Sequence, residues 1–485
     1  MKDISVIINT FSKEDKQEFV RFLKKKNQRG DVKNLQLFKL IDTGKQQDLD
    51  ILLYGKPSKN AYHALCKRLR DSLVDFTASK GFSGETSEEM EIMKLLLAGR
   101  IFLEQKLNKT AFKILAKAEK EALALDLHPI LNEIYHTKIQ FAHLNPNETL
   151  EEVIQASHTN MERFKKQFQL NMAYASIKKQ LKNPGDTPIT EIILKHFTVF
   201  NIKVDATLTY KSLFQLLNIT STAAALQRNY HEVSSFMMEI YNIISEKKGM
   251  AQKHLFYHIE ILQLMAVGSF RNKDFKQSKE FVAKMEAEMQ KNNRQYYRRF
   301  KDKLLVLKAM NLTYTGYVNK AVHLLENSKN ISLDSQLTLC MCFFQQSEFS
   351  KAYQVFKNFT HSDHWYDKKI GWLWVLKKSI IEILLLVELD KLDLVLSRLQ
   401  SFKKRFAKPL KKAGEERVLT FMKLVSDYYE NPEQVTTDTF KNKVETSFDW
   451  VGTHQEDIFV MSFYAWLKAK INNTNPYKTT LELVS

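Results

Sequence analysis

The sequence feature that most constrains the fold is the scarcity of residues that interrupt helices. Only 13 glycines and 8 prolines occur among 485 residues, which is too few for the many tight turns of an all-β protein or for a mononucleotide-binding α/β fold. Apolar residues recur at helical spacing along the chain. The sequence therefore predicts an all-α protein, and its length predicts two or three domains or one elongated solenoid.

Two polar segments interrupt the helical pattern and are expected to be linkers. Residues 81–89, "GFSGETSEE", contain two glycines, and residues 182–188, "KNPGDTP", contain two prolines and a glycine. Three helices are expected before the first linker, at 12–26, 31–41 and 58–80. The predicted division is an N-terminal helical domain at 1–82, a first block of helix pairs at 83–182, a middle helical block at 189–249, regular helix pairs at 250–472 and an irregular tail at 473–485.

Four helix-turn-helix segments in the second half of the chain can be aligned on one position of their second helix. In the best-preserved segment, "TYTGYVNKAVHLL", Gly316 stands at the turn and Ala321 at the aligned position. The aligned residues are Ser278, Ala321, Ala352 and Val395, and the residues twelve positions earlier are Ala266, Ala309, Cys340 and Ile383. Mostly small residues at these places predict antiparallel helices that approach closely, with successive pairs stacked on one another.

Two further expectations follow from this alignment. An earlier turn fits the same pattern, with Ala111 at the aligned position, Leu115 after it and Gly99 on the preceding helix. The apolar stripe of the last segment is expected to be buried and consists of Leu392, Val395, Leu396, Leu399, Phe402 and Phe406. The basic residues Lys403, Lys404, Arg405 and Lys408 lie near the end of that helix, where the helix dipole favours cations. No binding site is expected there.

The aligned segments resemble the tetratricopeptide repeat, whose helix pairs carry small residues at matching places and a glycine at the turn. Gly316 fits that turn, whereas Lys273, Ser347 and Asp390 stand there in the other copies. The family's early aromatic residue and its closing proline are absent, and the copies are unevenly spaced against a family period of about 34 residues. The resemblance covers mostly residues 86–125 and 250–410. It implies an α-solenoid with a concave groove for a peptide or protein, and a non-repetitive helical bundle is the alternative.

The order of a short N-terminal segment followed by helix pairs also resembles a group of uncharacterised bacterial helical-repeat proteins. That resemblance implies no activity.

The net charge of +18 and the pI near 9.4 favour a polyanionic partner, such as nucleic acid or an anionic membrane surface. Because the lysines are spread along the whole chain, the charge is also explained as an ordinary solubility device.

Two basic segments are candidate binding surfaces. In "KNNRQYYRRFKDK", four basic residues would share one face of a helix, with Tyr297 and Phe300 on the core face. The four are Lys291, Arg294, Arg298 and Lys301. In "NAYHALCKRLRD", the basic residues Lys67, Arg68 and Arg70 could enter the major groove of DNA, although nearby aspartates offer local ion pairs. Either basic face could also be an ordinary solvated surface.

Metal and catalytic motifs are weak. The segment "HSDHWYD" holds His361, Asp363, His364 and Asp367, and His254 and His258 form an i, i+4 pair. A zinc site draws converging ligands from separate segments, and the sequence has no Cys-x-x-Cys, no His-Glu-x-x-His and no phosphate-binding glycine loop. We therefore expect no metal, no cofactor and no enzymatic activity.

The cysteines and apolar segments bear on the compartment. Cys66, Cys340 and Cys342 cannot build a disulfide framework. The most apolar stretch, residues 380–389, is too short to span a bilayer, and the N-terminus lacks a signal-peptide pattern. We expect a cytoplasmic protein without a membrane span. The predicted function is a non-enzymatic scaffold that binds a peptide or protein partner in a solenoid groove, and the basic charge favours an acidic partner segment. The alternative is a nucleic-acid-associated regulator that uses the N-terminal domain or the Lys291–Lys301 segment.

Overall fold

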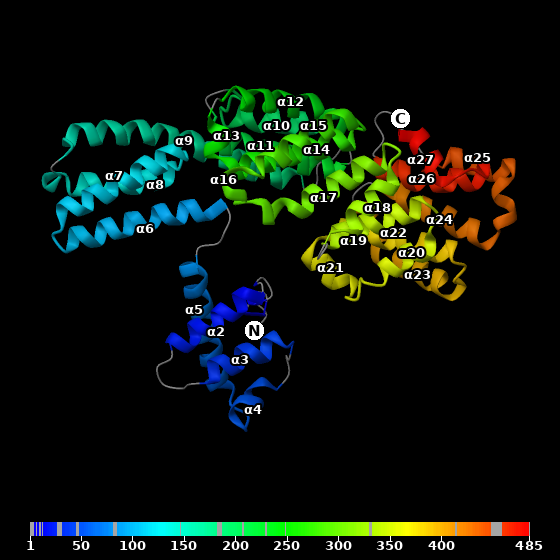
Figure 1. The fold of residues 1–485 in the computed structure, drawn as a ribbon, viewed down its shortest axis with the longest axis horizontal. Helices are drawn as coiled ribbons and strands as arrows, with labels where there is room; N and C mark the ends of the chain where they lie inside the picture. The colour runs from blue at the N-terminus through cyan, green and yellow to red at the C-terminus, as the bar shows by residue number, and fades with distance from the viewer. Residues whose placement is uncertain are drawn as a thin grey trace. The chain divides into compact units, whose positions relative to one another are not determined.

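All regular structure in the described part of the chain is helical. The computed structural model describes residues 4–5, 7–8, 11, 13–26, 32–44, 48–80, 85–145, 147–181, 187–205, 208–227, 230–247, 249–328, 332–412, 415–447 and 458–484. None of these residues lies in a β-strand, and successive helices pack against each other as pairs (Figure 1). The prediction of an all-α protein built from helix pairs is confirmed.

Contacts divide the chain into two units, Met1–His158 and Thr159–Ser485. The long helix α9 (Leu150–Gln180) begins in the first unit and ends in the second. The finer predicted division into five segments stays a prediction. The other elements of the first unit are α2 (Lys13–Lys26), α3 (Val32–Asp42), α4 (Leu49–Tyr54), α5 (Lys59–Lys80), α6 (Glu85–Glu104), α7 (Asn108–Ala124), α8 (His128–Gln140) and η1 (Ala142–Leu144).

The second unit carries most of the helices. After α9 they are α10 (Ile189–Val199), α11 (Tyr210–Gln227), α12 (Tyr230–Glu246), α13 (Met250–Lys253), α14 (Leu255–Arg271), α15 (Phe275–Glu288), α16 (Lys291–Arg294), α17 (Tyr297–Thr313), α18 (Val318–Glu326), α19 (Leu333–Gln345), α20 (Phe349–Phe356), α21 (Asp363–Lys369), α22 (Trp372–Glu388), α23 (Leu392–Lys412), α24 (Glu416–Glu430), η2 (Pro432–Thr436), α25 (Asp438–Thr446), α26 (Ile458–Asn472) and α27 (Pro476–Val484). Hydrophobic cores lie between these helices, because each amphipathic helix must bury its apolar face against a neighbour.

The N-terminal segment has a phenylalanine-centred core. The ring of Phe19 on α2 lies 5.0 Å from that of Phe38 on α3 and 5.2 Å from that of Phe76 on α5. The three predicted helices therefore exist and pack together. The short helix α4 was not predicted, because its six residues are too few to show a helical period.

The helix pairs share one turn geometry. The residue at each turn has a left-handed backbone, with φ of 61° at Lys106, 63° at Lys273, 91° at Gly316, 61° at Ser347 and 49° at Asp390. In each turn the amide of the next residue donates to the carbonyl five positions earlier, for example Glu348 N to Phe343 O at 2.9 Å. This is the hydrogen bond of a Schellman cap. The copies without glycine thus form the same turn as the copy that has it.

The small residues at the aligned positions lie at helix contacts. Ser278, Ala321, Ala352 and Val395 are fully buried. The Ser278 hydroxyl donates to the Ala266 carbonyl at 2.9 Å, and the Cys340 thiol donates to the Ala352 carbonyl at 3.4 Å. In the earlier pair, a Cβ on Gly99 would lie 2.8 Å from the Leu115 side chain. The expected close approach of paired helices is confirmed for these three pairs.

Two local expectations about apolar and polar segments are wrong. Leu392 and Leu396, expected in the buried stripe of α23, are 58% and 43% exposed. The stripe of α23 is broad, and α22 and α24 cover only the side that carries Val395 and Phe402. Residues 85–89 of the first predicted linker already belong to α6. Residues 81–84 and 182–186 lie outside the described residues.

The expectation of an irregular tail is also wrong. Residues Pro476–Val484 form α27, which packs on α26. The Tyr477 hydroxyl donates to the Thr313 carbonyl at 2.6 Å, and the Thr480 hydroxyl donates to the Gln345 side chain at 3.1 Å. The tail is therefore held by helices that lie far earlier in the sequence.

Candidate functional site

The predicted basic face of residues 291–303 is not a single helical face. Asn292 and Asn293 have left-handed backbone angles, with φ of 48° and 54°, so the helical direction breaks between α15 and α17. Asparagine tolerates this conformation better than other side chains do. Tyr296 and Phe300 are 7% and 0% exposed, so neither ring is available for stacking on a nucleic-acid base.

The four predicted binding residues of this segment lie in different surroundings. Lys291 pairs with Glu288 at 2.8 Å. Arg294 has φ of 62° and its guanidinium lies 3.9 Å from the centroid of the Tyr297 ring. The other two, both on α17, are Arg298, which is exposed, and Lys301, which is half-buried. The structure does not bring these four side chains onto one surface stripe, and their role in binding stays a prediction.

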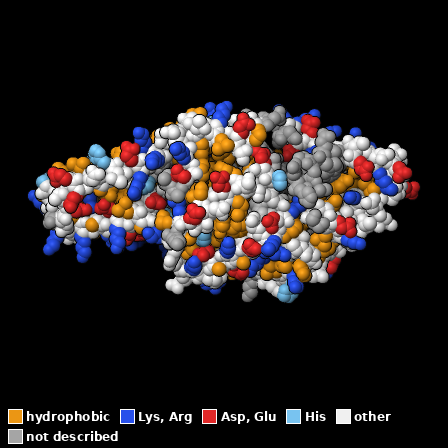
Figure 2. Space-filling view, turned by 90° about the horizontal axis from the view of Figure 1, so that it is seen from above, with side chains coloured by type: hydrophobic (Ala, Val, Ile, Leu, Met, Phe, Trp, Pro, Cys, Tyr) orange, Lys and Arg blue, Asp and Glu red, His pale blue; other side chains and the backbone are white. Residues whose placement is uncertain are grey.

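The predicted basic residues of α5 do lie on the surface. Lys67, Arg68 and Arg70 are all exposed, and two of them line a shallow hollow of about 390 Å³. The residues that line it are Tyr62, His63, Cys66, Lys67, Arg70 and Asp71. On the face seen in Figure 2, Lys and Arg side chains are mixed with Asp and Glu side chains. Binding of a polyanion by α5 stays a prediction.

The two histidine segments serve packing and hydrogen bonding in the structure. The His254 ring stacks on Tyr210 at 5.2 Å, and the Tyr210 hydroxyl lies 2.5 Å from Nδ1 of His258. Burial lowers the pKa of His258 and raises that of Tyr210, because each would have to carry its charge away from water. In the described ranges, no three His, Cys, Asp or Glu side chains are arranged to hold a metal ion.

The cysteine thiols on α19 are poor nucleophiles. Cys340 and Cys342 are 0% and 1% exposed. Burial raises the pKa of Cys340 to about 12 and that of Cys342 to about 11. Because the thiolate is the reactive form, these residues act as small packing side chains.

A pocket of about 750 Å³ lies among α20, α21, α22 and α23. Its volume is within the range of small-molecule and peptide side-chain sites. Its apolar lining consists of the buried residues Phe356, Phe359, Ile383, Phe402 and Phe406. Its polar lining consists of His361, Ser362, Asp363, His364, Lys378, Ser379, Glu382, Arg398, Ser401, Lys404 and Arg405.

The centre of the polar lining is a buried lysine. Lys378 on α22 is 6% exposed, and its Nζ lies 3.1 Å from Asp363 Oδ1 and 3.3 Å from Glu382 Oε2. The same ammonium lies 5.0 Å from the centroid of the Phe356 ring. A buried ammonium is costly to desolvate unless it is paired, and here two carboxylates pair it.

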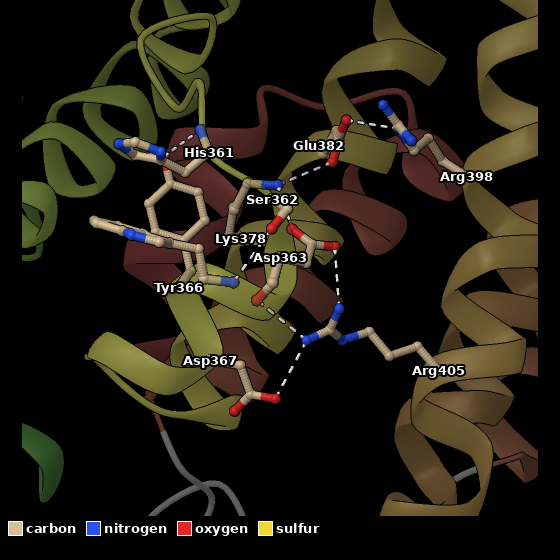
Figure 3. Close-up of polar contacts among 10 residues, drawn as sticks. His361, Ser362, Asp363, Tyr366, Asp367, Lys378, Glu382, Arg398 and Arg405 are labelled. Carbon is tan, nitrogen blue, oxygen red and sulfur yellow. Dashed lines mark hydrogen bonds and ion pairs between the residues drawn. The ribbon is translucent and has the colours of Figure 1, made fainter. Parts of the chain in front are cut away.

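Two arginines of α23 extend the ion pairs outward (Figure 3). Arg398 Nε donates to Glu382 Oε1 at 2.7 Å. Arg405 Nη2 donates to the Asp363 carbonyl at 3.2 Å and to Asp367 Oδ2 at 3.3 Å. Together with Lys378, these side chains form an alternating chain of charges, which we call the ion-pair chain: Arg398, Glu382, Lys378, Asp363, Arg405 and Asp367.

The loop between α20 and α21 lines one side of the pocket with His361 and Ser362. The His361 ring stacks on the Trp365 ring at 4.0 Å, and the His361 amide donates to the Tyr366 hydroxyl at 3.3 Å. Ser362 caps α21, because its hydroxyl accepts from the Trp365 amide at 3.3 Å. Residues 361–367 therefore form one fixed side of the pocket, and Asp363 and Asp367 both reach Arg405 on α23.

The sequence pointed to parts of this pocket without showing that they meet. Glu382 is a charge within the apolar stretch of residues 380–389, which suggests a buried partner. The basic run at 403–408 was assigned to the helix dipole alone. The aspartates of 361–367 and the arginines of α23 are distant in sequence. They meet because α21 packs on α22 and α22 packs on α23.

Comparison with known proteins assigns the chain to no family: no family model matches it, and no curated protein matches it. Among the described helices, we find none whose apolar run is sufficient for a bilayer span.

Proposed function

We propose that the protein is a cytoplasmic, non-enzymatic scaffold of tetratricopeptide-like helix pairs that binds a peptide or protein partner. The observation that carries this proposal is the pocket among α20–α23, which combines a phenylalanine lining with charged side chains fixed by one another. A site whose side chains are held in place before binding loses little side-chain entropy when a ligand enters. The repeated turn geometry supports the repeat-like part of the proposal.

The chemistry of the lining favours binding over catalysis. Among the serines that line the pocket, Ser362 uses its hydroxyl to cap α21. The carboxylates Asp363 and Glu382 are both engaged by cations. These ion pairs favour the ionised carboxylates and fix their positions, which suits recognition of a ligand.

A display selection of random peptides against the full-length protein tests this proposal. Ser401 is exposed and lines the pocket, so Ser401→Trp should fill the pocket without disturbing the core. Gln400→Trp places the same ring on the same helix outside the pocket lining. We expect selected peptides to lose binding to Ser401→Trp and to keep it with Gln400→Trp. Failure to select any peptide, or equal binding to both variants, would refute the proposal.

Nucleic-acid binding by α5 is a second proposal, supported by the exposure of Lys67, Arg68 and Arg70. Binding to phosphates releases counterions from the DNA. The logarithm of the binding constant should therefore fall linearly with the logarithm of the salt concentration. We expect a column of mixed-sequence duplex DNA to retain the full-length protein at low salt. The double variant Lys67→Glu, Arg68→Glu should pass through the same column without being retained. No retention of the unmodified protein would end this second proposal.

A further inference from the structure

The pocket carries cationic groups that the ion-pair chain does not use. Lys404 lines the pocket, and we find no hydrogen-bond or ion-pair partner for it among the described residues. Arg398 uses Nε toward Glu382, and no partner in the described part of the chain engages its two terminal nitrogens. Each group is exposed. The pocket therefore offers guanidinium and ammonium donors to an incoming anion.

The fixed carboxylates limit how much negative charge the pocket accepts. Glu382 lies between Lys378 and Arg398, and Asp363 lies between Lys378 and Arg405. A dense polyanion would be repelled by these carboxylates, since like charges at short range are unfavourable in a partly buried site. A single carboxylate can form charge-assisted pairs with the unengaged donors of Arg398 and Lys404 and adds only one negative charge beside Glu382.

The remaining lining selects an apolar group beside that carboxylate. Phe356, Phe402 and Phe406 are 6%, 3% and 2% exposed, and Phe402 packs on Phe406 with ring centroids 4.9 Å apart. These rings line the hollow but expose little of their surface, so they suit contact with one aliphatic side chain and not stacking with the face of a nucleic-acid base. An anionic group next to an apolar side chain is typical of an acidic peptide segment.

The geometry points to an acidic peptide segment as the ligand of this pocket, with one carboxylate held by Arg398 and Lys404 and a neighbouring apolar side chain on the phenylalanine lining. This inference rests on the proposed peptide-binding function and adds the chemical class of the partner.

Fluorescence anisotropy with two labelled peptides tests the inference. One peptide alternates glutamate with leucine, and the other alternates lysine with leucine. We expect the full-length protein to bind the glutamate peptide and not the lysine peptide. Lys404→Glu should weaken binding of the glutamate peptide by about tenfold or more. Lys403→Glu makes the same charge change at the adjacent exposed residue outside the lining, and it should change binding by less than about twofold.

Several outcomes would overturn the inference. Equal losses in Lys404→Glu and Lys403→Glu would show general charge attraction without a site. Displacement of the glutamate peptide by inorganic phosphate at equal concentration would assign the pocket to a phosphate ligand. If display-selected peptides are blocked by Ser401→Trp but the glutamate peptide does not bind, the acidic class is wrong and the proposed function stands. If no peptide is selected at all, the proposed function fails instead.

Discussion

At the residue scale, several turns hold a side chain where the backbone favours glycine. Ser347 is exposed and has φ of 61°, and we find no side-chain hydrogen bond for it among the described residues. The left-handed conformation costs a non-glycine residue about 1–2 kcal/mol. Glycine avoids this cost, but it lowers the free energy of unfolding by about 0.5–1 kcal/mol because its unfolded chain has more conformational freedom. We expect Ser347→Gly to raise the free energy of unfolding by about 0.5–1 kcal/mol, as measured by urea denaturation.

The matched control for this prediction is Gly316→Ala at the equivalent turn. Gly316 has φ of 91°, and no atom lies within 4 Å of the position that a Cβ would take. Any destabilisation of that variant therefore comes from the backbone alone. The two substitutions should shift stability in opposite directions, and shifts of the same sign would disprove the account of the turn.

A second residue-scale prediction concerns pH. Burial lowers the pKa of His258 from its ordinary 6.5, with smaller opposing and reinforcing effects from Glu288 and Lys291. Below pH 6.5 the unfolded chain gains a proton that the folded protein does not yet bind, so stability falls as pH decreases. We expect His258→Gln to flatten the pH dependence of the free energy of unfolding below pH 6.5. Burial also lowers the pKa of His196, so some dependence should remain, and an unchanged slope would contradict the prediction.

At the element scale, the close approach of paired helices can be tested with two glycines. A Cβ at Gly99 on α6 would lie 2.8 Å from Cγ and Cδ2 of the fully buried Leu115. Overpacking costs about 1–3 kcal/mol, whereas alanine gains about 1 kcal/mol in helix propensity over glycine. We expect Gly99→Ala to lower the free energy of unfolding by up to about 2 kcal/mol, measured by urea denaturation.

The control is Gly268→Ala on α14. There the nearest atoms are the flexible end of Met237, at 3.4 Å and 3.6 Å from the new Cβ. That spacing is ordinary contact, so helix propensity should decide and the variant should be neutral or more stable by up to about 1 kcal/mol. Destabilisation of both variants to the same extent would argue against tight packing at Gly99 specifically.

The helices and their small contact residues could be predicted from the sequence, because both follow from local spacing. The turns were harder to recognise, since Lys273, Ser347 and Asp390 adopt a backbone that glycine usually marks. The break at Asn292 and Asn293 had a local signal in the paired asparagines, but the apolar spacing continues across it. The pocket could not be predicted, because its ion-pair chain depends on the packing of α21 on α22 and of α22 on α23, which no local pattern records.

At the scale of the second unit, the C-terminal helices contact elements far from them in sequence. The Tyr314 hydroxyl lies 2.7 Å from the Ser462 hydroxyl, and Trp466 Nε1 donates to Glu388 Oε1 at 2.5 Å. In an open repeat array each pair contacts its sequence neighbours, and stability is a sum over neighbouring terms. Here α26 and α27 tie α17, α19 and α22 together, so loss of the last helices should affect the whole unit.

The last prediction is that deletion of residues 473–485 destabilises the second unit. The deletion removes the hydrogen bonds of Tyr477 and Thr480 and the buried Val484 side chain. With about 1 kcal/mol for each hydrogen bond and about 1.5–3 kcal/mol for the apolar side chain, the loss is about 3–5 kcal/mol. Tyr477→Phe removes one hydroxyl and should cost about 1 kcal/mol, whereas Lys478→Ala, at an exposed position of the same helix, should be neutral. Urea denaturation of the three variants measures these losses in the free energy of unfolding. If the deletion lowers that free energy no more than Lys478→Ala does, α27 contributes nothing to the stability of the unit.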